Sequence, residues 1–198
     1  MKYISIIILS LVIGIGAFFF IQKKEATTTT NPPLIRTESA QQTKAKSEEK
    51  TTAVPTKIII EKLGINAPIE SVGLDIQKRM DVPKDPDNAG WYNLGYKPGE
   101  TGSAVIAGHV DTPTGAPAIF YNLSELEKGD EIKTTDESGN SYLFTVEKSI
   151  IYDFDKVPLD EVFANKDKKR LNLITCDGTF DKANKNYTKR RVVYAVAK

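Results

Sequence analysis

The sequence predicts a mostly β domain over residues 56–198, most simply a closed β-barrel with short helices. Runs rich in β-branched and aromatic residues recur through this part of the chain, and glycine, proline, asparagine and aspartate bound them. Such runs are typical of strands joined by turns. Helical signals are short, and many short strands with small helical insertions favour a barrel. A β-sandwich stays open on this pattern alone.

A turn is expected at Asp136–Asn140 (DESGN), between two of the strands. Short helices are expected at Ser124, which precedes Glu125, and at Leu159–Ala164 after Pro158. The predicted strands are Lys57–Glu61, Ala104–Ala107, Tyr142–Ile151, Leu171–Thr175 and Val192–Val196.

Residues 1–24 are predicted to form an N-terminal membrane anchor. The stretch Ile4–Ile21 carries no charge and is almost wholly apolar. As a helix at ~1.5 Å per residue it is about 27 Å long, close to the ~30 Å hydrocarbon core of a bilayer. It ends in Phe18–Ile21 followed by lysines, a poor cleavage site, so a retained anchor is favoured over a signal peptide. Lysines flank the run on both sides and taken alone lean against an exported C-terminus.

Residues 25–55 are predicted to be a flexible linker. Thr, Lys, Glu, Ser, Gln and Pro dominate the segment, with few apolar residues among them. Such a segment buries too little surface to offset its chain entropy. A tether between an anchor and a folded domain suits a protein that works at a membrane surface, which supports export of the domain, residues 56–198.

Charge and cysteine content exclude several classes of protein. The chain has 27 Lys+Arg and 26 Asp+Glu, which argues against a nucleic-acid partner. A single cysteine excludes an internal disulfide framework, and one cysteine with one histidine does not make a zinc site, so no cofactor is expected. In an exported domain a lone thiol is either buried and inert or kept for its reactivity, and composition alone does not decide which.

Three residues with chemical potential lie beside predicted strands. His109, the only histidine, follows the predicted strand Ala104–Ala107. Cys176 ends the predicted strand that begins at Leu171, and Arg190 opens the last strand. A thiol nucleophile needs a partner for its proton and a donor for the oxyanion. Taken singly, each of the three residues is explained by an ordinary structural role. All three together, at strand ends of one β domain, form a rarer combination.

At these residues the sequence resembles the sortase family. Leu173-Ile174-Thr175-Cys176 is similar to the sortase signature Leu-x-Thr-Cys, Gly108-His109 follows an apolar strand as in sortases, and Arg190 precedes Val192-Val193-Tyr194 as in the sortase arginine strand. The resemblance covers the whole predicted domain. The segments 108–111, 118–123 and 175–181 look most like class F sortases.

The resemblance implies an eight-stranded sortase barrel and a cysteine transpeptidase. Cys176 would attack the Thr–Gly carbonyl of a Leu-Pro-x-Thr-Gly-like sorting signal on a surface protein, giving a thioacyl intermediate. His109 would exchange protons with the leaving and incoming amines, Arg190 would stabilise the oxyanion, and Thr175 would shape the substrate site. The acceptor would be an amine of a peptidoglycan precursor or a pilin lysine. The domain would lie outside the cell membrane of a Gram-positive-type envelope, on a single-pass anchor.

Two assignments and two rival functions stay open on the sequence. Arg190 and Arg191 point to opposite faces of a strand, and spacing favours Arg190. Asp111 either orients His109 or caps the loop; capping is favoured, and Asp111 is left out of the catalytic set. The rivals are a cysteine peptidase that hydrolyses its substrate and a tethered surface module without activity. An L,D-transpeptidase is disfavoured, because its Ser-x-Gly-Cys surroundings are absent.

Overall fold

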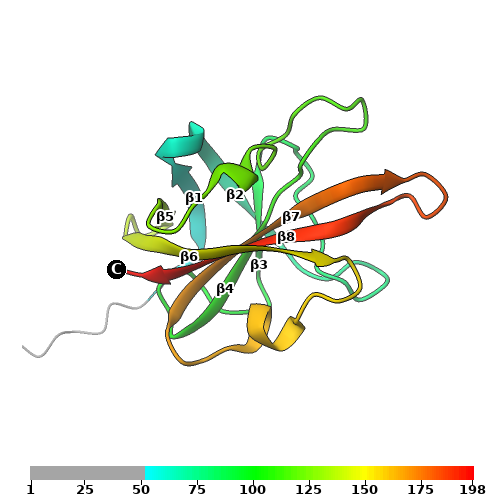
Figure 1. Ribbon diagram of the computed structural model, residues 1–198. Coiled ribbons are helices and arrows are strands. Elements are labelled where there is room, and N and C mark those ends of the chain that lie inside the picture. Colours follow the sequence, from blue (N-terminus) through cyan, green and yellow to red (C-terminus); the bar gives the residue numbers. More distant parts are fainter. Residues whose placement is uncertain (1–51) are drawn as a thin grey trace, which may run out of the picture. The chain divides into compact units, whose positions relative to one another are not determined.

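The computed structural model describes residues 52–198 of the chain (Figure 1). The predicted anchor and nearly all of the predicted linker lie outside these residues. Within the described part, no helix combines the length and apolar character needed to cross a membrane. In chain order the elements are β1 (Pro55–Ile60), η1 (Glu61–Leu63), β2 (Ile65–Val72), β3 (Ala89–Tyr92), β4 (Gly102–Ala107), η2 (Leu123–Glu125), β5 (Glu131–Asp136), β6 (Ser141–Asp153), η3 (Asp160–Ala164), β7 (Lys169–Asp181) and β8 (Asn186–Ala197).

The eight strands close into a barrel, which confirms the barrel and rules out the sandwich. Their order around the barrel is β1-β2-β3-β4-β7-β8-β6-β5. The β2–β3 and β4–β7 pairs are parallel and the others antiparallel. All five predicted strands are present, together with β2, β3 and β5, and short helices occur at both predicted places.

The barrel encloses the main core. Alternate residues along each strand point inward, so β7 contributes Leu171 and Leu173, and β8 contributes Val193 and Ala195, all fully buried. A second, smaller cluster lies on the outer face of β4, β7 and β8. There Val105, Val192 and Tyr194 pack under Val162 of η3. The two faces of β7 and β8 are therefore both covered by apolar side chains at this end, which fixes which residue faces which way.

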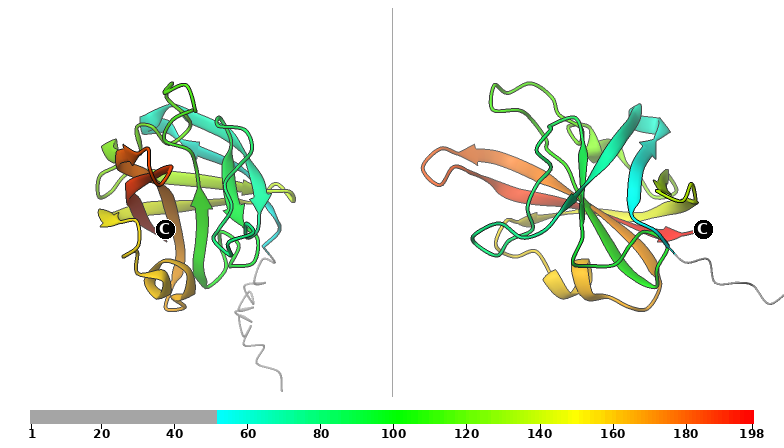
Figure 2. Two further views of the ribbon diagram at one scale, coloured as in Figure 1. Left: turned by 90° about the vertical axis from the view of Figure 1, so that its right-hand side faces the viewer. Right: turned by 180° about the vertical axis from the view of Figure 1, so that it is seen from behind.

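Strands β7 and β8 are longer than predicted. They continue past the barrel as a two-stranded hairpin, visible in Figure 1 and in the right view of Figure 2. Cys176 and Arg190 thus lie within strands, and the prediction that Cys176 ends its strand and Arg190 opens the last one is wrong. The register shifts between Asp177 and Phe180. Gly178 takes up this irregularity with φ +79°, a conformation that side-chain-bearing residues rarely adopt.

A buried carboxylate, that of Asp136 at the end of β5, holds the start of the domain in place. Its oxygens accept hydrogen bonds from the backbone of Ala53 and Asn140, from the Asn140 side chain and from the Tyr142 hydroxyl. Burial raises the pKa of Asp136, but these hydrogen bonds outweigh burial and hold the pKa below its usual value. The ionised carboxylate therefore stabilises the fold at neutral pH, and this contribution is lost as the pH falls through the lowered pKa.

We expect Asp136→Ala to lower the free energy of unfolding by about 3 kcal/mol, because it leaves several buried donors without an acceptor. Equilibrium unfolding in urea measures this loss. Asp136→Asn is the matched control: it keeps one carbonyl acceptor and is expected to be less destabilising. Equal stability of Asp136→Ala and the wild type would contradict the role of this carboxylate.

Candidate active site around Cys176

Cys176 lies directly opposite Arg190 in the β7–β8 pair. The register matches Cys176 with Arg190, and Thr175 with Arg191. Residues directly opposed in an antiparallel pair share one face, with Cβ atoms about 4.5–5.5 Å apart. The thiol is half-buried and has no disulfide partner, being the only cysteine of the chain. Because the inner face carries Leu171, Leu173 and Thr175, Cys176 and Arg190 belong to the outer face.

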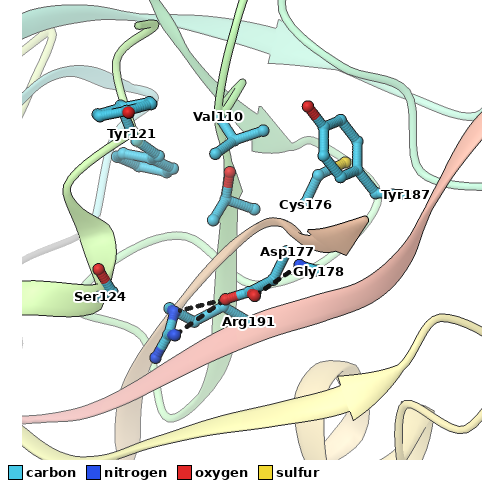
Figure 3. A pocket seen from close by; sticks show the side chains of 10 residues that line it. Val110, Tyr121, Ser124, Cys176, Asp177, Gly178, Tyr187 and Arg191 are labelled. Atoms are coloured by element: carbon cyan, nitrogen blue, oxygen red, sulfur yellow. Dashed lines mark hydrogen bonds and ion pairs between the residues drawn. The ribbon is translucent and has the colours of Figure 1, made fainter. Parts of the chain in front are cut away.

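Arg190 and Arg191 differ in their hydrogen-bond and ion-pair partners. Arg191 forms an ion pair with Asp177, in which Nε and Nη2 both lie 2.9 Å from the same carboxylate oxygen (Figure 3). It also donates to the Ser149 hydroxyl. Arg190 donates to the backbone carbonyls of Tyr187 and Lys189 and to the Asn186 side chain, and is in no ion pair among residues 52–198. The uncompensated guanidinium is therefore the one on the Cys176 face. The geometry favours Arg190 over Arg191, as the spacing did.

His109 lies two residues after the end of β4, the strand that pairs with β7 in parallel. Ala107 pairs with Ile174, and the Gly108 N–H donates to the Ile174 carbonyl at 3.1 Å. The β4–β7 pairing ends at Ala107 and Ile174, two residues before His109 and Cys176, and a continued register would bring these two residues level with each other. The Thr175 hydroxyl donates to the Gly108 carbonyl at 2.8 Å and so joins β7 to the residue that follows β4.

Two further contacts fix the histidine. Its Nε2 lies 2.9 Å from the Pro83 carbonyl; since a carbonyl only accepts, Nε2 carries the hydrogen. Among the hydrogen bonds of residues 52–198 the ring uses Nε2 only, which leaves Nδ1 for proton exchange. The ring of Phe120 packs so closely on Gly108 that a side chain at this position would overlap it. Gly108 is therefore required for this path of the chain, and with it the placing of His109.

Opposite charges act on the Cys176 thiol from two sides. Burial raises the pKa of the thiol, the Arg190 guanidinium lowers it, and the Asp111 carboxylate raises it, with a net rise above the usual value. The resting thiol is therefore protonated at neutral pH, and a base must take its proton when it attacks.

A pocket of ≈ 250 Å³ opens next to the thiol (Figure 3). Strand β7 contributes Thr175, Cys176 and Asp177, and β8 contributes Tyr187 and Arg191. The chain between β4 and β5 supplies the facing wall, formed by Val110, Phe120, Tyr121 and Ser124. Thr175 thus lines the pocket and also holds Gly108 in place.

The sequence interpretation did not foresee two contacts at this site. Among the hydrogen bonds of residues 52–198, the Asp111 carboxylate has neither His109 nor a loop N–H as a partner; it accepts one from the hydroxyl of Tyr187, which lines the pocket. This bond raises the pKa of Tyr187 to about 12. The second is the Asp177–Arg191 pair. Tyr187 lies in the part of β8 for which the sequence predicted no strand, so no pattern marked it. Within residues 52–198, no three His, Cys, Asp or Glu side chains gather in a way that would hold a metal ion.

The barrel topology and the cysteine opposite an arginine define a class of protein, a β-barrel with a thiol at the centre of its candidate site. Comparisons with known proteins identify the family. The sequence pattern of the sortase domain matches residues 58–198. Sortase D of Bacillus subtilis (strain 168) is 30% identical over 138 residues, 70% of this chain and 63% of that protein, so the chain spans less than two thirds of this relative. The chain belongs to the sortase family.

Solved structures of sortases share the fold. A Clostridium perfringens structure titled as a sortase D5 transpeptidase has a TM-score of 0.55 and 25% identity, covering 73% of this chain and 79% of its own. Sortase A of Listeria monocytogenes has a TM-score of 0.56 and 23% identity, covering 74% and 88% of the two chains. The second likeness is one of fold alone.

We expect the pKa of the Cys176 thiol to follow the two charges beside it. Arg190→Gln should raise this pKa, Asp111→Asn should lower it, and Arg190→Lys, which keeps the charge, should leave it close to that of the wild type. The rate of alkylation by iodoacetamide as a function of pH, followed by intact mass, measures each value. Identical profiles for Arg190→Gln and the wild type would show that Arg190 does not act on the thiol.

Proposed function

We propose that this protein is a cysteine transpeptidase that cleaves a Leu-Pro-x-Thr-Gly-like sorting signal of surface proteins and transfers the acyl part to an amine. The observation that carries the proposal is the strand register that sets Cys176 opposite Arg190 in a sortase barrel, with His109 two residues past the last β4–β7 pair. Nucleophile, base and oxyanion donor are the three groups that acyl transfer through a thiol requires.

In the proposed reaction the Cys176 sulfur attacks the carbonyl carbon of the Thr–Gly bond. Nδ1 of His109 takes the thiol proton, which the raised pKa of Cys176 makes necessary. The Arg190 guanidinium, a fixed cation on the same face, stabilises the oxyanion. The C–N bond then breaks as His109 protonates the departing glycine amine. An incoming amine replaces it, loses its proton to His109 and releases the acyl group from the sulfur.

The finer assignments rest on the sequence. The segments 108–111, 118–123 and 175–181 support class F, whereas two of the relatives named above carry the name sortase D. The predicted anchor, residues 1–24, and linker, residues 25–55, support an extracellular domain held at the membrane of a Gram-positive-type envelope, where a peptidoglycan precursor or a pilin lysine supplies the amine. Residues 56–198 then form the catalytic domain.

Product analysis distinguishes the transpeptidase from a hydrolysing peptidase. We expect incubation with a Leu-Pro-x-Thr-Gly peptide and glycinamide to yield the ligated amide, at the expense of the free acid as glycinamide increases. Cys176→Ala should yield neither product, and His109→Ala should be slower by at least a hundredfold, the range of a general acid–base group.

The matched control is Glu137→Gln, which removes an exposed carboxylate in the turn between β5 and β6. It should form both products at the rates of the wild type. A product that is always the free acid, whatever the amine concentration, would favour the peptidase. Turnover by Cys176→Ala would exclude both thiol enzymes.

A further inference from the structure

We propose that Asp111 and Tyr187 form a recognition site for the ammonium group of the acceptor amine, next to the pocket that Cys176 and Tyr187 line. The inference rests on the proposed transpeptidase function and adds to it the place where the second substrate binds. It assigns a role to a carboxylate that neither the thiol chemistry nor the fold requires.

The hydrogen bond between Asp111 and Tyr187 joins two segments that frame the pocket. Asp111 follows Val110, a lining residue, and Tyr187 is itself part of the lining. The backbone of Asp111 pairs with Pro117, which shapes the segment as a hairpin. The Tyr187 ring packs edge-on against Phe180, with centroids 5.3 Å apart. Both groups are thus held in place by contacts other than their own hydrogen bond.

The charge of Asp111 is uncompensated. Asp177, the acid that lines the pocket, is neutralised by Arg191 at 2.9 Å. Asp111 forms no ion pair with any residue of the described range 52–198, and its observed side-chain partner is the neutral Tyr187 hydroxyl. A carboxylate has about four acceptor positions, and Tyr187 takes one of them. The remaining positions suit a cation with several N–H donors, such as a primary ammonium.

An anion near a nucleophilic thiol needs a reason, because it disfavours the thiolate. A cationic second substrate supplies one. Most amines carry a positive charge at neutral pH, and a carboxylate at the pocket raises their local concentration. Cys176 lines the pocket together with Tyr187, the hydrogen-bond partner of Asp111, whereas Arg190 is not among the lining residues. An amine held by Asp111 would therefore approach the thioacyl group from the pocket, and the oxyanion donor would act from outside it.

The transfer step balances without a further reactant. The bound ammonium loses one proton to His109, which passes it to solvent. The nitrogen lone pair then forms a C–N bond with the thioacyl carbon as the C–S bond breaks. The second proton of the nitrogen goes to the departing sulfur, which restores the Cys176 thiol. Asp111 binds and orients the amine and exchanges no proton.

Two acceptors of different charge test the inference. Glycinamide is mostly a cation at neutral pH, whereas hydroxylamine is uncharged there. For each acceptor the ratio of aminolysis to hydrolysis of the thioacyl intermediate is measured against acceptor concentration, in the wild type, in Asp111→Asn and in the control Glu137→Gln. Asparagine keeps an oxygen acceptor for Tyr187 and removes only the charge. The rate of thioacyl formation is measured in parallel.

We expect Asp111→Asn to raise the glycinamide concentration needed for half-maximal transfer by about tenfold, which corresponds to ~1.4 kcal/mol. Use of hydroxylamine should change less than twofold, and thioacyl formation should not slow. Added salt should weaken glycinamide use in the wild type and in Glu137→Gln but not in Asp111→Asn.

Two results overturn the inference, and they are distinguishable. An unchanged glycinamide requirement in Asp111→Asn, or an equal loss for both acceptors, would show that Asp111 does not bind the ammonium, while thioacyl formation still upholds the proposed function. A wild-type protein that forms no thioacyl intermediate with any sorting-signal peptide would overturn the proposed function and this inference together.

Discussion

The antiparallel register between β7 and β8 is the constraint on which the rest of the site depends. It sets Cys176 opposite Arg190 on the outer face and Thr175 opposite Arg191 on the inner one. A slip of one residue would turn every side chain to the other face. The register is held by the core, because Leu171 and Leu173 fill the barrel together with Val193 and Ala195. Packing energy far from the thiol thus decides which arginine acts on it.

The parallel β4–β7 pair adds the histidine to this arrangement. Its last pair, Ala107 with Ile174, lies two residues before His109 and Cys176, and the Thr175–Gly108 hydrogen bond joins the two segments beyond that pair. Thr175 therefore contributes to the site through the backbone of Gly108 as well as through the pocket. Around the thiol the structure balances a cation, Arg190, against an anion, Asp111. A site with one charge of each sign suits a reaction with an oxyanion and a cationic amine.

Much of this site was predictable from the sequence, and the exceptions have physical causes. Strands such as β4 and β7 bury residues on both faces, so they stand out as apolar runs. Strand β5 (EIKTTD) contains a single apolar residue and β3 has only four residues, so neither gives a strong pattern. The hairpin beyond Asp177 has little core to bury, and so its polar residues resembled a loop. The Asp111–Tyr187 hydrogen bond joins residues 76 positions apart in the sequence, which local patterns do not encode.

Intact-mass spectrometry of the protein with a panel of sorting-signal peptides tests the central claim most directly. The account predicts that one or more peptides form a covalent adduct on Cys176. The added mass is that of the peptide up to its threonine, and hydroxylamine removes it. A thiol that iodoacetamide alkylates readily but that accepts no acyl group from any peptide of the panel would contradict it.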